Sequence, residues 1–355
     1  MLYLGIDQHS KQLTISLRDE DGSVTRRRQV STRPEKVETF LQELCEAAEP
    51  LGGFMAIVEV CGFNDWLVAM LGNYECREIV LIHPDKRDKR KTDRRDANAL
   101  SELLWLNRER LTEGRRPRGL RRVVVPTRLE QQMRELTSSR QRLGRLRTRT
   151  INQMQGLMRR YNLVWESPTK NFQTKAVARW LRELTTSRKL SRLDRLQLSQ
   201  WLDQWQLYDD QLEELNEQID SWSRFHRWVN LLRTIPGMGA YSGLAIASRI
   251  GDIRRFPHPR SLGNYFGLTP SCRNSGEAKQ RLGSITKDGS RIVRFLLGQL
   301  VLHVLKNDAW MRNWYRQIKQ RRGSKIARVA VMRRITTIIW HMLWNNESYQ
   351  AGGPR

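Results

Sequence analysis

LYLGIDQHSKQLTISLRDEDGSVTRRRQV, at residues 2–30, is the stretch that decides the fold of the first third of the chain. Apolar side chains alternate with polar ones at Leu13, Ile15 and Leu17, which is the period of a strand with one buried face. The pair Asp21-Gly22 follows, and such a pair commonly forms the turn between two antiparallel strands. The stretch therefore predicts a β-hairpin with charged flanks, preceded by the short strand LYLGID.

Strands and helices alternate in the residues that follow. Pro34 opens a segment, residues 34–49, whose apolar side chains share one helical face. Further strands are expected at 54–60 and 78–82, and further helices at 63–73 and 93–107. Alternation of this kind predicts an α/β domain with a mixed sheet.

The middle of the chain predicts two long helices. The second has apolar residues at the a and d positions of a heptad repeat. These residues are Leu198, Trp201, Trp205, Tyr208, Leu212, Leu215, Ile219 and Trp222. The pair predicts a long antiparallel coiled coil. Two interpretations remain open, namely an arm for oligomerisation or for binding a guide nucleic acid, and an internal helical hairpin that packs on its own domain.

The last third of the chain is expected to be mostly helical. Residues 231–250, LLRTIPGMGAYSGLAIASRI, predict two helices joined by a Pro-Gly-Met-Gly turn. Residues 324–344 predict a basic amphipathic helix. We therefore expect three domains: an α/β domain at 1–125, a coiled-coil region at 126–229, and a mostly helical domain at 230–355.

The net charge indicates a polyanionic partner. The 355 residues include 63 Lys and Arg against 37 Asp and Glu, so the formal charge is +26 and the isoelectric point is about 10.8. Such a surplus of positive charge repels itself unless a polyanion is present. Phosphate contacts dominate the affinity of basic proteins for nucleic acid. We therefore expect nucleic acid to be the partner.

Composition excludes several classes of protein. Hydrophobic residues make up 39% of the chain, which suffices for packed cores and excludes wholesale disorder. No apolar run approaches the roughly 18–20 residues that span a bilayer, and the first residues lack the pattern of a signal peptide. The cysteines have no paired spacing and are expected to be reduced. We expect a cytoplasmic protein with no membrane partner.

Four acidic residues are candidates for a metal site. Asp7 and Glu59 each end a predicted strand, and Asp93 and Asp96 are spaced to share one face of a helix. Carboxylate oxygens are the ligands that Mg²⁺ prefers, and Mn²⁺ accepts them as well. Two such metals stabilise the attacking and the leaving oxygen of phosphoryl transfer. The alternative is that Asp93 and Asp96 pair with basic residues of 86–95.

The turn Pro236-Gly237-Met238-Gly239 resembles a helix-hairpin-helix motif. Gly237 and Gly239 would let the backbone approach a phosphate, which the N–H groups of the following helix would bind. The alternative is a tight helical hairpin without a ligand.

A basic loop near residue 275 contains a candidate nucleophile. Ser275 lies between Asn274 and Gly276, and its hydroxyl could attack a phosphate whose charge nearby cations stabilise. The cations, all candidates for nucleic-acid binding, are Lys279, Arg281, Lys287, Arg291 and Arg294. By itself the Ser-Gly pair favours an ordinary turn, and Ser271, Ser284 and Ser290 are rival hydroxyls.

Several motifs, taken in order, resemble one family. They are GID at 5–7, VEVCG at 58–62, KTDRRDA at 91–97, IPGMG at 235–239 and GLTPSCRNSGEAKQRLGSITKDGSRIVRFLL at 267–297. In this order they resemble the DEDD-type insertion-sequence transposases of families 110 and 1111, relatives of the Piv DNA invertase. The resemblance covers nearly the whole chain and is most specific in 1–100 and 231–297.

The resemblance implies an architecture and a chemistry. It implies an RNase H-like (RuvC-like) domain, a coiled coil, and a C-terminal transposase domain that carries a helix-hairpin-helix element and the essential serine. By position, the family's metal-binding acids fall on Asp7, Glu59, Asp93 and Asp96. The essential serine falls on Ser275, although the family often has Ser-Ser-Gly where this chain has Asn274-Ser275-Gly276.

The expected function is site-specific DNA recombination that excises and inserts a mobile element. The resemblance implies guidance by a noncoding bridge RNA, donor and target DNA as substrates, and a homodimer or homotetramer. The setting would be the nucleoid of a bacterium or archaeon. Two alternatives remain open: a metal-dependent endonuclease of the Holliday-junction-resolvase type that uses water, and a non-catalytic RNA-binding scaffold.

Overall fold

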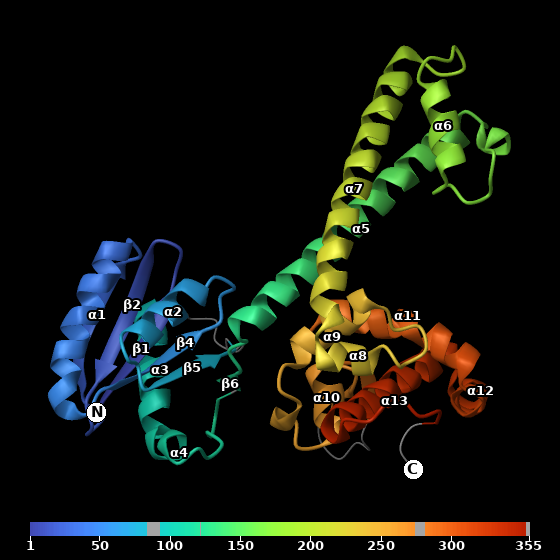
Figure 1. Cartoon of the computed structure of the whole chain (residues 1–355). Coiled ribbons are helices and arrows are strands. Elements are labelled where there is room, and N and C mark those ends of the chain that lie inside the picture. The colour runs from blue at the N-terminus through green and yellow to red at the C-terminus, as the bar shows by residue number, and fades with distance from the viewer. Residues whose placement is uncertain (84–92, 121, 274–280, 353–355) are drawn as a thin grey trace. The chain divides into compact units, whose positions relative to one another are not determined.

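The chain forms two compact units, Met1–Val125 and Pro126–Arg355 (Figure 1). A computed structural model describes residues 1–83, 93–120, 122–273 and 281–352. In those ranges no helix is both long and apolar enough to cross a bilayer.

The first unit is built on a six-stranded sheet in the order β3-β2-β1-β4-β5-β6. The strands are β1 (Leu2–Gln8), β2 (Gln12–Arg18), β3 (Val24–Ser31), β4 (Phe54–Glu59), β5 (Glu78–Ile82) and β6 (Arg122–Val123). β1, β4 and β5 run parallel, whereas the other pairs are antiparallel. The predicted mixed sheet is confirmed, and so is the hairpin, which β2 and β3 form around the turn at Asp21 and Gly22.

Helices cover both faces of this sheet (Figure 1). Helices α1 (Pro34–Ala48) and α2 (Asp65–Asn73) bury one face, against Leu4, Ile6 and Val58. Helices α3 (Asp93–Leu106) and α4 (Arg108–Thr112) bury the other, against Tyr3 and Ile57.

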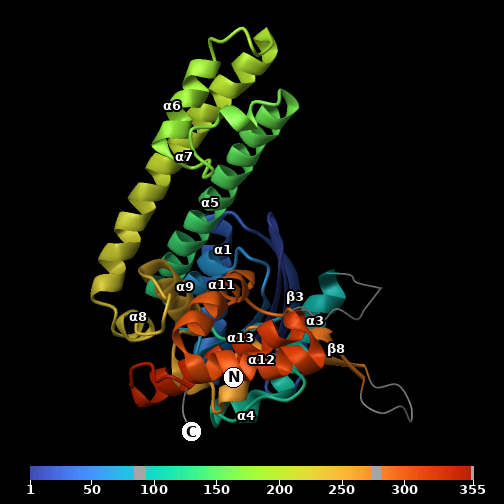
Figure 2. The same ribbon diagram turned by 90° about the vertical axis from the view of Figure 1, so that its right-hand side faces the viewer.

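Two long helices begin the second unit. They are α5 (Arg128–Arg160) and α7 (Arg192–Arg224), each 33 residues long. Both begin at side-chain caps, since Thr127 and Glu130 form a capping box on α5 and Ser191 accepts from the backbone N–H of Asp194 on α7. The contacts Arg140–Asn216, Arg147–Asp209 and Arg160–Asp194 show that α5 and α7 run antiparallel. The short helix α6 (Lys175–Leu184) lies along α7, at the end of the α5–α7 pair that is remote from the other helices of the second unit (Figures 1 and 2).

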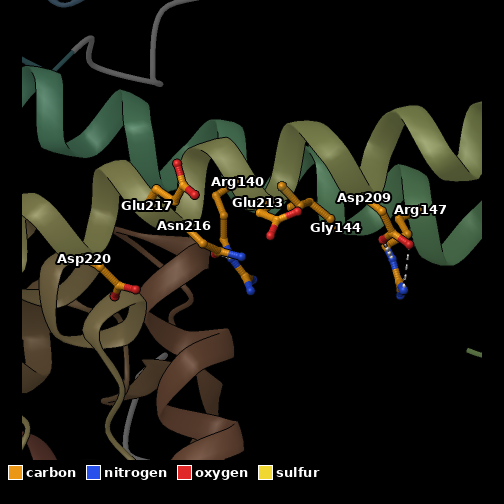
Figure 3. Close-up of a pocket in the computed structure, with 9 residues that line it drawn as sticks. Arg140, Gly144, Arg147, Asp209, Glu213, Asn216, Glu217 and Asp220 are labelled. Carbon is orange, nitrogen blue, oxygen red and sulfur yellow. Dashed lines mark hydrogen bonds and ion pairs between the residues drawn. The ribbon is translucent and has the colours of Figure 1, made fainter. Parts of the chain in front are cut away.

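The heptad face of α7 is buried at its two ends and half-buried in the middle. Leu198 and Trp205 pack in a small apolar cluster with α5 and α6, and Ile219 packs in the core at the base of the pair. Between them Leu212 lines an open polar pocket of about 650 Å³ (Figure 3). There Arg147 is directed at Asp209, and the Nε of Arg140 donates to the Oδ1 of Asn216 at 3.1 Å. These contacts join α5 to α7 within one chain, and both a regular coiled coil and the choice between an arm and an internal hairpin stay predictions.

The remaining helices form the body of the second unit. They are α8 (Arg227–Leu232), α9 (Ala240–Ile250), α10 (Pro259–Tyr265), α11 (Arg291–Asn307), α12 (Ala309–Arg322) and α13 (Ser324–Asn345). The helix predicted at 324–344 matches α13, but it is less amphipathic than expected. Its apolar residues lie on several sides because α8, α10, α11 and α12 all contact it.

A buried arginine, Arg249, and a half-buried one, Arg134, join α5 to α9. Arg249 is 8% exposed, and its guanidinium donates to the hydroxyls of Thr137 and Ser138 on α5. Arg134 on α5 donates in return to the carbonyl oxygen of Ser248 at 2.8 Å. Burial, and to a lesser degree the positive charge of Arg134, lower the pKa of Arg249 to about 10. Because backbone and hydroxyl oxygens accept these donors, α5 is attached firmly to the helical body at its base.

Candidate functional site

Strand register places Asp7 beside Glu59. β1 and β4 are parallel neighbours, and Ile6 pairs with Val58. Asp7 and Glu59 are the next residues along each strand, so both lie at the carboxyl end of the sheet's parallel core. That edge is where open α/β sheets place their ligands.

Strand alternation places both side chains on the same face. On β1 the even-numbered Leu4 and Ile6 pack under α1 and α2, whereas Tyr3 packs under α3. Successive side chains of a strand point to opposite faces, so Asp7 shares the α3 face with Tyr3. On β4 the same rule places Glu59 with Ile57, which also packs under α3.

Helix α3 runs back along this face from the acidic edge. A Cβ atom on Gly5 would lie 2.4 Å from the carbonyl oxygen of Ala97 and from the backbone nitrogen of Ser101, so only glycine permits this close approach. Trp105, further along α3, donates to the carbonyl oxygen of Glu20, near the opposite end of β1. The first turn of α3, which begins at Asp93 and includes Asp96, is therefore on the Asp7 side of Gly5.

The local surroundings of the acids are partly described. The Asp7 side chain is 13% exposed, and its Oδ2 lies 3.2 Å from the Nε2 of His9. The side chain of Asp93 lies outside the described residues. Among the side chains that are described, no three His, Cys, Asp or Glu groups converge closely enough to hold a metal ion. The four-acid site therefore stays a prediction, supported by strand register and by the chemistry of its oxygen donors.

A buried amide pair supports this edge and was not found from the sequence. Asn64 is 6% exposed, and its Nδ2 donates to the Gln8 side chain at 2.8 Å and to the Glu59 carbonyl oxygen at 2.9 Å. Its Oδ1 accepts from the backbone N–H of Cys61 at 2.8 Å. Asn64 thus joins the ends of β1 and β4 next to Asp7 and Glu59. The sequence signal was weak, because an Asn after a strand is common in loops.

The two glycines of the turn between α8 and α9 have different surroundings. Gly237 has a φ of +85°, and a Cβ there would lie 2.3 Å from the Cβ of His303 on α11. Close packing on α11 therefore explains Gly237. Gly239 precedes α9, and a Cβ there would have no described atom within 4 Å, so there is space beside the helix N-terminus. A helix-hairpin-helix role in binding phosphate stays a prediction.

The NSG loop is carried by a two-stranded hairpin, β7 (Pro270–Arg273) and β8 (Arg281–Ile285). Ser275 and Lys279 lie outside the described residues, as does the side chain of Arg281. Two rival serines have structural contacts. Ser271 donates to the Ser284 carbonyl oxygen at 3.0 Å, and Ser290 accepts from the backbone N–H of Val293 at the start of α11.

The cations that follow the loop differ in their contacts. Arg294 is already engaged, because its NH1 donates to the carbonyl oxygens of Phe266, Asp288 and Gly289 at the root of the hairpin. Lys287 and Arg291 have exposed side chains. They therefore remain better candidates for phosphate contacts than Arg294.

Comparison with known proteins gives two family matches. A family described as "Transposase IS116/IS110/IS902 family" matches residues 229–316, and a DEDD transposase family of IS110 type matches residues 4–163. The first range contains the glycine turn and the hairpin, whereas the second contains all four acids and the whole of α5.

Individual relatives agree with these matches. The transposase for insertion sequence element IS1111A of Coxiella burnetii is 26% identical over 83% of this chain and 79% of its own length. A probable family 20 transposase of Pseudomonas aeruginosa is 27% identical over 74% of this chain and 75% of its own length. A pilin gene-inverting protein of Moraxella bovis is 24% identical over 42% of this chain and 46% of its own length.

Proposed function

Because the chain belongs to the IS110/IS1111 family of DEDD transposases, enzymes that cleave and rejoin DNA, we propose that it excises and inserts its own mobile element. The observation that carries this proposal is the placement of Asp7 and Glu59 in register, on the sheet face that α3 covers. The position of Asp96 in the first turn of that helix, toward the same edge of the sheet, supports the proposal.

A divalent metal, as this family generally requires, fits the carboxylate oxygens at this edge. We assign Asp7, Glu59, Asp93 and Asp96 as its ligands, with Mg²⁺ or Mn²⁺ as the ion. Such an ion would stabilise negative charge on the scissile phosphate. The chain's own contribution is to hold the strand ends rigidly, through the contacts of Asn64 with Gln8 and with the Glu59 backbone.

Ser275 is the proposed nucleophile. Its Oγ would attack the phosphorus while one P–O bond to a DNA strand end breaks, so that the proton of the hydroxyl is lost and the leaving oxygen gains one. The resulting phosphoserine ester keeps the bond energy for rejoining, whereas hydrolysis by water would lose it. The family resemblance implies an active site shared between subunits, with the acids from one subunit and the serine from another. Such a site requires a dimer or a tetramer.

A noncoding bridge RNA is the proposed guide. The formal charge of +26 supports a large nucleic-acid partner. α5 contributes to that charge through the cations Arg140, Arg142, Arg145, Arg147 and Arg149. In guided systems base pairing supplies the sequence specificity, so the choice of target DNA would reside in the RNA.

The test is excision in vitro by protein purified with its co-purifying RNA, supplied with the element's ends and Mg²⁺. We expect a rejoined donor junction from the native protein and none from Asp7→Asn or Ser275→Ala alone. Mixing these two variants should restore part of the activity if the site is shared between subunits. Cleaved ends that are never rejoined would favour the resolvase-type endonuclease, and the absence of any cleavage by the native protein would favour the scaffold.

A further inference from the structure

A basic cleft in the second unit has no role in the function proposed above. It has a volume of about 350 Å³ and lies between α10, α12 and α13. Its floor is made of small residues, since Gly263 is buried and Thr336 is 1% exposed. A volume of this size is typical of pockets that hold one small ligand.

The walls of the cleft combine an aromatic ring with cations. Trp314 on α12 contributes the ring, and Arg260 on α10 and Arg333 on α13 contribute exposed guanidinium groups. Among the described residues neither guanidinium lies within 4.0 Å of a carboxylate. No Asp or Glu occurs between Ala309 and Asn345. On α12 and α13, therefore, no carboxylate competes with a bound anion for these guanidinium groups.

The cleft lies at the root of the β7–β8 hairpin. Thr269, the residue before β7, lines it, and the Thr269 carbonyl oxygen accepts from the backbone N–H of Thr286 just after β8. The hairpin that rises from this root carries the loop with Ser275. A ligand in the cleft would therefore lie beside the base of the segment that carries the proposed nucleophile.

We propose that this cleft binds one unpaired nucleotide of the DNA strand, with its base against Trp314 and its phosphate between Arg260 and Arg333. Bases stack on aromatic side chains in single-strand sites, and guanidinium groups suit phosphate oxygens. A concave cleft of this volume cannot admit a base that is stacked within a duplex, so the nucleotide must be extruded or single-stranded. The choice of DNA over RNA rests on the proposed function, because DNA is the strand that Ser275 would attack.

The test is photo-cross-linking without divalent metal, with a single-stranded DNA oligonucleotide that contains iodouracil. Peptide mapping should place the label on the peptide that contains Trp314. The same base within a duplex should give little label there. Arg260→Gln and Arg333→Gln should each weaken single-strand binding about threefold to tenfold and lower the salt slope by about one.

The matched control is Arg316→Gln, which removes an exposed arginine of α12 outside the cleft. We expect this change to leave the Trp314 label in place. Equal losses in all three variants, a label that maps elsewhere, an equal label from the duplex, or a stronger label from RNA of the same sequence would each overturn the proposal. The cross-link requires neither Ser275 nor the metal ligands, so its failure is distinguishable from failure of the recombinase proposal.

Discussion

The candidate metal ligands and the candidate nucleophile are carried by two different kinds of backbone. Asp7 and Glu59 lie at the carboxyl ends of adjacent parallel strands of a six-stranded sheet, Asp7 one residue before the last residue of β1 and Glu59 at the last residue of β4. Strand register and the Asn64–Gln8 contact hold these ends together. Ser275 belongs instead to the loop of an isolated two-stranded hairpin in the other unit. We propose that this difference reflects a division of roles, in which the sheet would hold the metal ligands and the loop would supply the nucleophile when protein and DNA assemble.

The largest effect should come from removing one charge at the acidic edge. Asp7→Asn, Glu59→Gln and Asp96→Asn each keep the side chain's shape, but each takes away a ligand charge worth several kcal/mol in the transition state. Each should therefore lower the rate of DNA cleavage by about a thousandfold while leaving RNA binding unchanged. The measurement is strand cleavage with Mg²⁺, beside filter binding of the RNA.

Glu38→Gln is the control for these changes, since Glu38 is an exposed acid on α1, over the opposite face of the sheet. It should cleave at the native rate. Near-native cleavage by any of the three edge variants would remove that residue from the metal site.

A smaller effect on cleavage should distinguish a residue that positions the acidic edge from one that only stabilises the fold. Asn64 and Asn107 are both buried amides that hold a loop, Asn64 at the acidic edge and Asn107 at the end of α3 through the backbone of Arg118. Asn64→Ala and Asn107→Ala should each lower the free energy of unfolding by about 1–3 kcal/mol, because buried partners lose hydrogen bonds.

Only Asn64→Ala should also slow cleavage, by about tenfold or more, at a temperature where both variants are folded. The comparison needs thermal melts and cleavage rates for the same two preparations. If Asn107→Ala slowed cleavage to the same degree, the effect would be one of general stability and Asn64 would have no special part in positioning the acids.

The smallest effect concerns the pH dependence of the second unit. Burial lowers the pKa of His226, whose Nδ1 accepts from the backbone N–H of Val229 at the start of α8. The folded state therefore holds a proton on His226 more weakly than the unfolded state does, and the unfolded state takes up a proton as the pH falls through about 6.5. This contribution to stability is complete above that pH and is lost below it.

His226→Asn should make melting of the second unit less dependent on pH between 8 and 5, because Asn caps a helix without titrating. Burial lowers the pKa of His341 as well, so part of the dependence should remain. Calorimetric melts of the variant and the native chain at several pH values provide the measurement. An unchanged dependence on pH would mean that the pKa of His226 is the same in the folded and the unfolded state.

Regular elements were predictable from the sequence because periodicity reports which face is buried. The alternation at Leu13, Ile15 and Leu17 located β2, and the acids Asp7 and Glu59 were recognisable as strand ends. What periodicity could not supply was long-range pairing. The contacts of Asn64 with Gln8, 56 residues away in sequence, follow from the parallel register of β1 and β4, which has no local signature.

The dependence on long-range contacts also explains why the predictions for the long helices, the glycine turn and the basic cleft were less complete. The heptad face predicted the second long helix, α7, but polar contacts such as Arg147 with Asp209 replace apolar packing in the middle (Figure 3). A glycine in a turn is consistent with phosphate binding or with close packing, and Gly237 is explained by His303. The basic cleft was not found because Arg260, Trp314 and Arg333 come together only through helix packing.

The most direct test of the division between a rigid metal edge and a delivered nucleophile is a search for a covalent bond between Ser275 and DNA. Protein, guide RNA and labelled DNA are incubated with Mg²⁺, denatured in detergent and separated, and labelled peptides are mapped. We expect label that migrates with the protein, maps to residues 274–279 and disappears in Ser275→Ala, although that variant should still bind RNA and DNA. Label on Ser271, Ser284 or Ser290 would contradict the assignment of Ser275, and free cleaved ends without any adduct would contradict covalent catalysis altogether.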